Sequence, residues 1–359
     1  MHPDERRDRL DAVLISPEAT IARAVERLER AGTGALLVCD RERRLIGLLT
    51  DGDVRRAILA GVSFDRACVE VAKREPVVAT ADVTPAEALQ LMDRGREFVV
   101  NHLPLVTADG VVVGLLLRSD LVTREQLPLS AVIMAGGFGK RLLPLTEQTP
   151  KPMLRVGDRP LLERTIGSLR DAGIARVAIT THHLADRITG HFGDGSGFGV
   201  ELSYVSEDSP LGTAGALRLL GEVREPVLVI NGDILTGISY ADMLRFHRAN
   251  RADMTVGVRR CDVEIPYGVL ETDGAYIRGV REKPRSSFLI NAGIYLLEPA
   301  VHRLIPDGRR FDMTDLIQRL LDEGRRVASF PIVEYWLDIG QRADYEQAQL
   351  DIEVAGIDR

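Results

Sequence analysis

The sequence predicts an α/β protein in which a small repeated module precedes a mostly parallel sheet covered by helices. A length of 359 residues exceeds one typical domain. A helix–strand–strand order occurs twice before residue 125, and strands alternate with helices from residue 131 onward. The apolar share of 45% is enough to fill the cores of such domains. We therefore expect a module over 1–124, a linker over 125–130 and a second domain over 131–359.

The first copy of the repeat begins with an amphipathic helix capped by Thr20. Its apolar residues recur near positions i, i+3, i+4 and i+7, the spacing of one helical face. Two apolar runs, 35–39 and 45–50, flank a polar turn and predict a pair of strands. A second helix is expected from Asp51.

The second copy repeats this order. Thr84 is the expected N-cap of its helix and Pro85 the first helical residue, because proline needs no intrahelical donor there. Strands are predicted at 103–106 and 111–117, and a closing helix is predicted from Arg118. One copy alone would bury too little apolar surface, so the two copies should pack on each other.

The second half alternates between strands and helices, which indicates a mostly parallel sheet with helices on its faces. The expected strands are 131–134, 176–181, 201–205 and 226–231, and the expected helices are 161–170 and 214–220. Ligands of such sheets bind at the carboxyl ends of the strands. The loop after the strand at 131 and the turn containing Asp233 should both lie there.

A glycine-rich loop follows the strand that starts at Ala131. Glycine lets the backbone take positive φ and approach a phosphate closely, and nearby cations add full positive charge. The Walker pattern is absent and the Rossmann spacing fits poorly. The loop therefore indicates a nucleotide phosphate site of another kind, formed by Gly136, Gly137, Gly139, Lys140, Arg141 and Lys151.

The run from Ala135 to Thr146, followed by Pro150-Lys-Pro152, resembles the signature of the sugar-1-phosphate nucleotidyltransferases. The resemblance covers about 131–350 and implies a Rossmann-like, GT-A-like domain that converts NTP and sugar 1-phosphate into NDP-sugar and pyrophosphate. It implies that nucleotide binding involves Ala135, Gly136, Gly137, Gly139 and Lys140, and that catalysis involves Arg141, Lys151 and Lys283. The family usually has Thr or Ser where this chain has Lys140.

Two aspartates are the expected metal ligands. Asp233 follows a buried strand beside the phosphate loop, where a carboxylate suits Mg²⁺ bridged to substrate phosphates. The resemblance assigns Asp233 as the first ligand. It assigns Asp338, in the segment Trp336-Leu-Asp-Ile-Gly340, as the second.

Further segments resemble the substrate-binding parts of the family. The resemblance places the sugar at Tyr267, Gly268, Glu282 and Asn291, with Lys283 of the Glu-Lys-Pro motif on the sugar phosphate. It places the base at Glu207, Gly212 and Thr213. The form Leu211-Gly-Thr-Ala-Gly215 is closer to the mannose-1-phosphate guanylyltransferase branch than to the thymidylyltransferases, so GTP is favoured. The alternatives are an enzyme that uses dTTP, UTP or CTP with a sugar or alcohol phosphate, and a non-catalytic nucleotide sensor.

The repeat resembles a tandem pair of CBS modules. The resemblance rests on Gly47-Leu-Leu-Thr-Asp-Gly-Asp53 and Gly114-Leu-Leu-Leu-Arg-Ser-Asp120. It implies that an adenine nucleotide binds through Thr50, Asp53 and Asp120 and regulates the enzyme. The second copy has Leu117 where the family has a hydroxyl residue. A purely structural module, with its aspartates as helix N-caps, is the alternative.

The composition excludes other classes of function. A net charge of −7 argues against a nucleic-acid binder, and no apolar run approaches the length of a membrane span. Three scattered cysteines fit a reduced, cytoplasmic protein better than a disulfide frame. We expect no membrane partner, and we expect a homo-oligomer, either a dimer or a tetramer.

Overall fold

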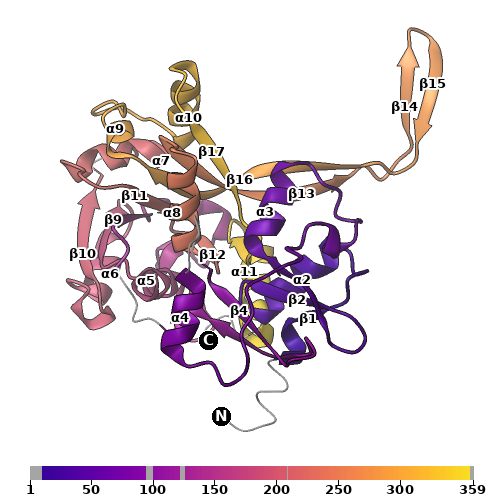
Figure 1. The fold of residues 1–359 in the computed structure, drawn as a ribbon. Coiled ribbons are helices and arrows are strands. Elements are labelled where there is room, and N and C mark those ends of the chain that lie inside the picture. Colours follow the sequence, from indigo (N-terminus) through magenta and orange to yellow (C-terminus); the bar gives the residue numbers. More distant parts are fainter. Residues whose placement is uncertain (1–9, 94–99, 122–125, 208, 356–359) are drawn as a thin grey trace. The chain divides into compact units, whose positions relative to one another are not determined.

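The chain folds into two units (Figure 1). A computed structural model describes residues 10–93, 100–121, 126–207 and 209–355. The N-terminal unit comprises the chain up to Leu127, the short segment Val333–Tyr335 and the residues from Asp351 onward. The C-terminal unit comprises Pro128–Ile332 and Trp336–Leu350. The chain therefore leaves the C-terminal unit for three residues and then returns to it.

The N-terminal unit contains the two copies of the repeat, and their elements follow the predicted order. They are β1 (Leu14–Ile15), α2 (Ile21–Ala31), β2 (Ala35–Cys39), β3 (Leu45–Thr50), α3 (Asp51–Leu59), a 3₁₀ turn (Cys68–Glu70), α4 (Pro85–Asp93), β4 (His102–Val106), β5 (Val112–Leu117) and a second 3₁₀ turn (Arg118–Asp120).

The two copies differ in their sheets. In the first, β2 pairs in parallel with β1 and antiparallel with β3, and all five residues of β2 are buried. In the second, β4 and β5 pair antiparallel, and the counterpart of β1 is a single parallel bridge between Ala79 and Leu105. The predicted helix from Arg118 is a short 3₁₀ turn over its described residues, and residues 122–125 lie outside the described chain.

The predicted helix caps are confirmed. The Thr20 hydroxyl accepts a hydrogen bond from the Arg23 amide at 3.2 Å. The Thr84 hydroxyl accepts from the Glu87 amide at 3.3 Å, and the Thr84 amide donates to the Glu87 carboxylate at 3.0 Å. These contacts satisfy backbone donors that a helix start leaves without intrahelical partners, which is why hydroxyl residues occupy these positions.

The C-terminal unit alternates between strands and helices. Its strands are β6 (Ser130–Met134), β7 (Arg155–Val156), β8 (Arg159–Pro160), β9 (Arg176–Thr181), β10 (Glu201–Ser206), β11 (Val227–Asn231), β12 (Ile234–Thr236), β13 (Met254–Glu264), β14 (Val269–Asp273), β15 (Tyr276–Arg281), β16 (Arg285–Leu297), β17 (Val327–Pro331) and β18 (Trp336–Asp338). Its helices are α5 (Leu161–Asp171), α6 (Ala185–Phe192), α7 (Gly212–Gly215), α8 (Tyr240–Ala249), α9 (Pro299–His302), α10 (Met313–Asp322) and α11 (Arg342–Ala355), with 3₁₀ turns at Lys140–Leu142, Lys151–Met153, Ser196–Phe198 and Ala216–Leu220.

The main sheet has the order β10-β9-β6-β11-β16-β13-β17 over the described residues. The pairings from β10 through β11 are parallel, β16 runs antiparallel to both of its neighbours, and β17 is parallel to β13. The predicted mixed, mostly parallel sheet is therefore confirmed. Its core packs Val229, Met254 and Tyr295 against Leu316 and Leu320 of α10.

One predicted helix is shorter than expected. The segment 214–220 divides into a four-residue α7 and a 3₁₀ turn. A Cβ built at Gly215 would lie 3.2 Å from the Arg309 carbonyl, so the glycine allows this segment to lie directly against neighbouring backbone. Close packing of backbone on backbone replaces the amphipathic helix that the apolar pattern suggested.

The strands β14 and β15, together with the adjoining ends of β13 and β16, form an arm over residues 263–290 (Figure 1). Its apolar side chains are exposed: Val263, Ile265, Tyr267, Leu270, Tyr276, Ile277, Val280, Phe288, Leu289 and Ile290. A two-stranded hairpin buries little surface on its own, so it has marginal intrinsic stability in water. Across the described residues, no helix is both long and apolar enough to span a membrane.

Candidate active site

The glycine-rich loop lies at the carboxyl end of β6, a central strand of the sheet. The Ala135 amide donates to the Thr180 carbonyl on β9 at 3.1 Å, which fixes the start of the loop. Gly139 has φ +62°, and a Cβ there would lie 2.9 Å from the Thr146 side chain. The Thr146 hydroxyl in turn donates to the Gly139 carbonyl at 2.9 Å. Glycine at 139 is therefore required both by conformation and by space.

The three cations after the loop occupy different environments. Lys140 is exposed, and its Nζ lies 5.5 Å from the centre of the Phe138 ring. Arg141 is also exposed, whereas Lys151 is 9% exposed. A buried ammonium needs an anionic partner to remain charged, so Lys151 has the most specific electrostatic role of the three.

The two predicted metal ligands lie next to each other. Asp233 follows β11, and the strand after it, β12, pairs antiparallel with β18 so that Ile234 lies opposite Asp338. The Ile339 amide donates to the Asp233 carbonyl at 2.9 Å. Burial raises the pKa of Asp338 above its ordinary value, and the charge of Asp233 raises it further, while Lys151 and Arg141 oppose both effects. The two carboxylates thus share one electrostatic environment.

Two of these cations, Lys151 and Arg141, lie near the acidic pair. The Lys151 ammonium forms an ion pair with the Asp233 carboxylate. A Cβ built at Gly340 would lie 3.6 Å from Arg141 Nη1 and 3.6 Å from Asp338 Oδ1, so both side chains lie close to that glycine. The charge of Arg141 also lowers the pKa of Asp338. The structure therefore brings together Arg141, Lys151, Asp233 and Asp338, four residues that are spread over about 200 positions of the sequence.

Asn231 is a candidate site residue that sequence reasoning missed. It ends β11 two positions before Asp233, and its Oδ1 is buried without a hydrogen-bond partner among the described residues. A buried carbonyl oxygen without a partner costs free energy unless something donates to it or coordinates it. The signal available in the sequence was its position, since it is the only polar residue of an otherwise apolar strand.

The residues present fit a magnesium ion. Magnesium prefers oxygen ligands and takes one or two protein carboxylates together with substrate phosphates. Asp233 and Asp338 supply the carboxylates, and the unpartnered Oδ1 of Asn231 lies on the same strand end. Within the described parts of the chain, no three His, Cys, Asp or Glu residues form a metal cluster. A carboxylate pair completed by substrate phosphate is the arrangement that these residues support.

The predicted base-binding residues separate into two groups. Glu207 is buried, and a Cβ at Gly136 would lie 2.7 Å from its Oε1, so this carboxylate lies against the glycine-rich loop. Gly212 and Thr213 instead contact the start of α10. The Thr213 amide donates to Asp312 Oδ1 at 3.1 Å, and the Thr213 hydroxyl accepts from the Met313 amide at 2.8 Å.

Only some of the predicted sugar-binding residues lie near Asp233 and Asp338. Tyr267 and Gly268 precede β14, and Glu282 and Lys283 follow β15, so all four lie on the exposed arm. Tyr267 is 74% exposed. Asn291 lies on β16 within the main sheet, and its side chain hydrogen-bonds Tyr295, whose pKa is raised by burial and by the charge of Asp233. Asn291 is thus the member of this group that lies near the acidic pair.

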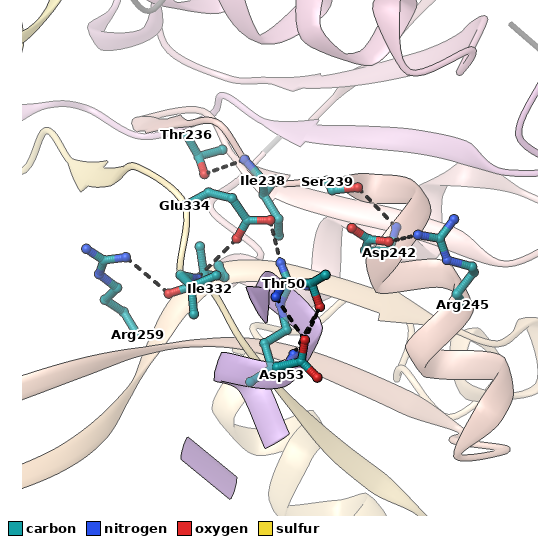
Figure 2. Close-up of polar contacts among 12 residues, drawn as sticks. Thr50, Asp53, Thr236, Ile238, Ser239, Asp242, Arg245, Arg259, Ile332 and Glu334 are labelled. Atoms are coloured by element: carbon teal, nitrogen blue, oxygen red, sulfur yellow. Dashed lines mark hydrogen bonds and ion pairs between the residues drawn. The ribbon is translucent and has the colours of Figure 1, made fainter. Parts of the chain in front are cut away.

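In the N-terminal unit, Thr50 and Asp53 form a reciprocal cap at the start of α3. The Thr50 amide donates to Asp53 Oδ2 at 2.8 Å, and the Thr50 hydroxyl donates to the same oxygen at 2.7 Å (Figure 2). Asp120 of the second copy is exposed and ends a 3₁₀ turn. The structure therefore gives Thr50 and Asp53 a capping role, and a ligand that bound them would compete with this cap.

Comparison with known proteins gives matches over both parts of the chain. The family model described as nucleotidyl transferase matches residues 130–354, and the CBS domain model matches 8–60 and 68–126. A mannose-1-phosphate guanylyltransferase of Mycobacterium tuberculosis is 38% identical over 50% of this chain and 52% of its own length. A UTP–glucose-1-phosphate uridylyltransferase of Synechocystis is 33% identical over 52% of this chain and 53% of its own length.

Among solved structures, a putative glucose-1-phosphate thymidylyltransferase from Bacillus anthracis has a TM-score of 0.50 and 26% identity, over 62% of this chain and 94% of that one. The crystal structure of HddC from Yersinia pseudotuberculosis complexed with GMP-PN has a TM-score of 0.50 and 25% identity, over 62% of this chain and 99% of that one. The chain spans about half the length of the curated relatives described above. The transferase match extends over more than half of the chain. The chain therefore belongs to the nucleotidyl transferase family, and two CBS domains precede its transferase region.

Proposed function

We propose that the protein is a sugar-1-phosphate nucleotidyltransferase that makes NDP-sugar and pyrophosphate from NTP and sugar 1-phosphate. The observation that carries the proposal is the convergence of Lys151 with Asp233, and of Arg141 with Asp338, beside the glycine-rich loop. A protein that only binds nucleotide has no need of a buried lysine paired with an aspartate at the end of a strand. The Lys151–Asp233 ion pair therefore favours a catalytic function over a non-catalytic nucleotide sensor.

The reaction requires positioning and charge neutralisation more than proton transfer. An oxygen of the sugar phosphate attacks the α-phosphorus of the NTP, the bond to the bridging oxygen breaks, and pyrophosphate leaves. The attacking phosphate is ionised near pH 7, so no strong general base is needed. Arg141 lies where it can neutralise the leaving pyrophosphate, and Lys151 where it can hold a reacting phosphate close to Asp233.

Magnesium is the proposed metal, held by Asp233 and Asp338. When bound, it would neutralise charge on the α-phosphate. Lys151, which forms an ion pair with Asp233, would supply positive charge to a substrate phosphate beside that carboxylate.

GTP is the proposed nucleotide and mannose 1-phosphate the first sugar phosphate to test. The guanylyltransferase relative at 38% identity and the Leu211–Gly215 segment support this choice. The uridylyltransferase relative makes UTP the alternative. The test is pyrophosphate release from GTP, UTP, dTTP and CTP, each paired with mannose 1-phosphate and glucose 1-phosphate. Absence of pyrophosphate release in every pair would reject the proposed activity.

The N-terminal unit is proposed to bind an adenine nucleotide. The two CBS matches and the retained Thr50 and Asp53 support this. Titration of AMP, ADP and ATP in a calorimeter tests the binding, and Asp53→Asn should weaken it. Equal affinity of the wild type and this variant would place the ligand elsewhere.

The protein is further proposed to be a cytoplasmic homo-oligomer, either a dimer or a tetramer. Buried, unpaired Cys39 and Cys68 support a reducing compartment. The exposed apolar side chains of the arm support association with a second copy of the chain. Light scattering on the purified protein gives the mass of the assembly, and a monomer mass would reject the oligomer.

A further inference from the structure

A three-residue segment of the transferase region belongs by its contacts to the N-terminal unit. Val333, Glu334 and Tyr335 are grouped with that unit, whereas Ile332 and Trp336 on either side are grouped with the other. Val333 is 4% exposed and packs in the core cluster that contains Leu36 and Val54. The Tyr335 hydroxyl donates to Asp351 Oδ2 at 2.7 Å. The segment is thus anchored on both sides of Glu334.

Glu334 makes the polar contact at the centre of this anchor. Its carboxylate forms an ion pair with Arg55 of α3, and the two side chains are 14% and 6% exposed. Its other oxygen accepts from the Val333 amide at 3.1 Å (Figure 2). A buried ion pair contributes little net stability, because desolvation offsets the attraction. Its directional contacts can still specify one geometry where apolar packing would accept several.

The chain passes from this anchor to a proposed metal ligand within four residues. Trp336–Asp338 form β18, which pairs with β12, and the Ile339 amide donates to the Asp233 carbonyl. The Trp336 indole also donates to the Ala292 carbonyl at 2.9 Å. Only Tyr335 separates Glu334 from β18, so no loop lies between this anchor and the strand that carries Asp338.

We propose that Arg55 and Glu334 are positioning residues that fix the strand carrying Asp338 from within the N-terminal unit. Arg55 lies one helical turn after the Thr50–Asp53 cap, on the same helix. The positioning of a metal ligand rests on the proposed function, whereas the link between Glu334 and β18 does not.

The test compares Glu334→Gln with Arg164→Met. The control removes an arginine of similar burial, paired with Asp158 in the C-terminal unit, at a position outside the 333–340 segment. Hydrogen exchange of the peptide covering 336–340 is the readout that requires no catalysis, because the Ile339 amide reports the β12–β18 contact. Glu334→Gln should speed exchange in this peptide, and Arg164→Met should leave it unchanged.

Kinetics supply the second readout. Misplacement of a metal ligand by about 1 Å can cost on the order of 100-fold in rate, so we expect kcat of Glu334→Gln to fall ~10-fold or more. The Mg²⁺ concentration at half-maximal rate should rise, while KM for NTP changes by less than about twofold. If both exchange and kcat match the wild type, the inference is overturned. If the wild type is inactive but exchange responds, the proposed function fails and the structural link stands.

A double variant separates positioning from folding. Arg55→Met combined with Glu334→Leu removes both members of the ion pair together, and Asp51 then loses the repulsion of Glu334 along with the attraction of Arg55. The thermal midpoint of the double variant should therefore stay nearer that of the wild type than the midpoint of either single variant. We expect it to remain as impaired in kcat and exchange as Glu334→Gln. Recovery of both values to those of the wild type would show that apolar packing suffices, and would overturn the role of the ion pair.

Discussion

Asp51 makes the stability of the N-terminal unit depend on pH. It is the first residue of α3 and is 9% exposed. Burial, together with the charges of Glu334 and Asp53, raises the pKa of Asp51 from 3.8 to about 7, and the charge of Arg55 opposes this rise. The imidazole of His102 also lies beside Gly34, against which Asp51 packs. Between about pH 4 and pH 7, Asp51 therefore keeps its proton in the folded protein, whereas the same carboxyl group has lost it in the unfolded chain.

The sign follows from linkage. A carboxyl group with a raised folded pKa contributes stability that is fully present below about pH 4 and is lost as the pH rises to about 7. A difference of about 3 between the two pKa values corresponds to about 4 kcal/mol at most. Asp51→Asn removes this titration, so we expect it to be more stable than the wild type by only about 1 kcal/mol near pH 4.5 and by roughly 2 to 4 kcal/mol near pH 8.

Urea unfolding followed by circular dichroism at several pH values measures this difference. Asp65→Asn, an exposed carboxylate change in the same unit, is the matched control and should show no comparable trend. A difference between Asp51→Asn and the wild type that stays constant from pH 4.5 to pH 8 would refute the reasoning. So would a variant that is less stable than the wild type at pH 8.

Three further predictions concern the two candidate sites. Lys151→Met should lower kcat by ~100-fold or more, because it removes a preorganised charge beside Asp233. Lys283→Met should mainly raise KM for sugar 1-phosphate, because Lys283 lies on the exposed arm and not beside the acidic pair. Equal effects of the two variants in steady-state kinetics would contradict this division. Gly293→Ala should destabilise the protein by more than about 1 kcal/mol, because φ is +70° and a Cβ would lie 2.6 Å from the Asn231 amide nitrogen. Gly274→Ala at φ +59°, with open space around it, is the control, and similar thermal midpoints would count against the clash. Thr50→Ala should cost about 1 kcal/mol through loss of the cap and should also weaken AMP binding in calorimetry; unchanged affinity would show that the hydroxyl only caps the helix.

Sequence patterns predicted the helices and strands that are determined by residues close together in the sequence. The helix from Thr20, the cap at Thr84 and the strand at Arg176–Thr181 follow from apolar spacing and hydroxyl chemistry, and each is present. The segment at 214–220 departed from prediction because contact with the Arg309 backbone, a tertiary effect, decides its shape. The resemblance selected Asp233 and Asp338, and the pairing of β12 with β18 brings them together.

Other features had no local signal. Asn231 becomes a candidate site residue only because its buried Oδ1 has no hydrogen-bond partner among the described residues, and this is a property of the folded protein. The exposure of Tyr267 and Lys283 depends on how far the arm extends from the sheet, which a motif does not encode. The contact between Arg55 and Glu334 joins residues 279 positions apart, and no periodicity connects them.

The return of the chain to the N-terminal unit limits how this protein can be divided. A shortened chain beginning at residue 128 would keep Val333 and Tyr335 but would lack the core that covers Val333. An isolated chain ending at 127 would lack Glu334 and would leave Arg55 without its carboxylate. Neither part of the chain therefore contains all of the residues that its own contacts require. A genetic exchange that replaced the N-terminal module would have to change positions 333–335 at the same time.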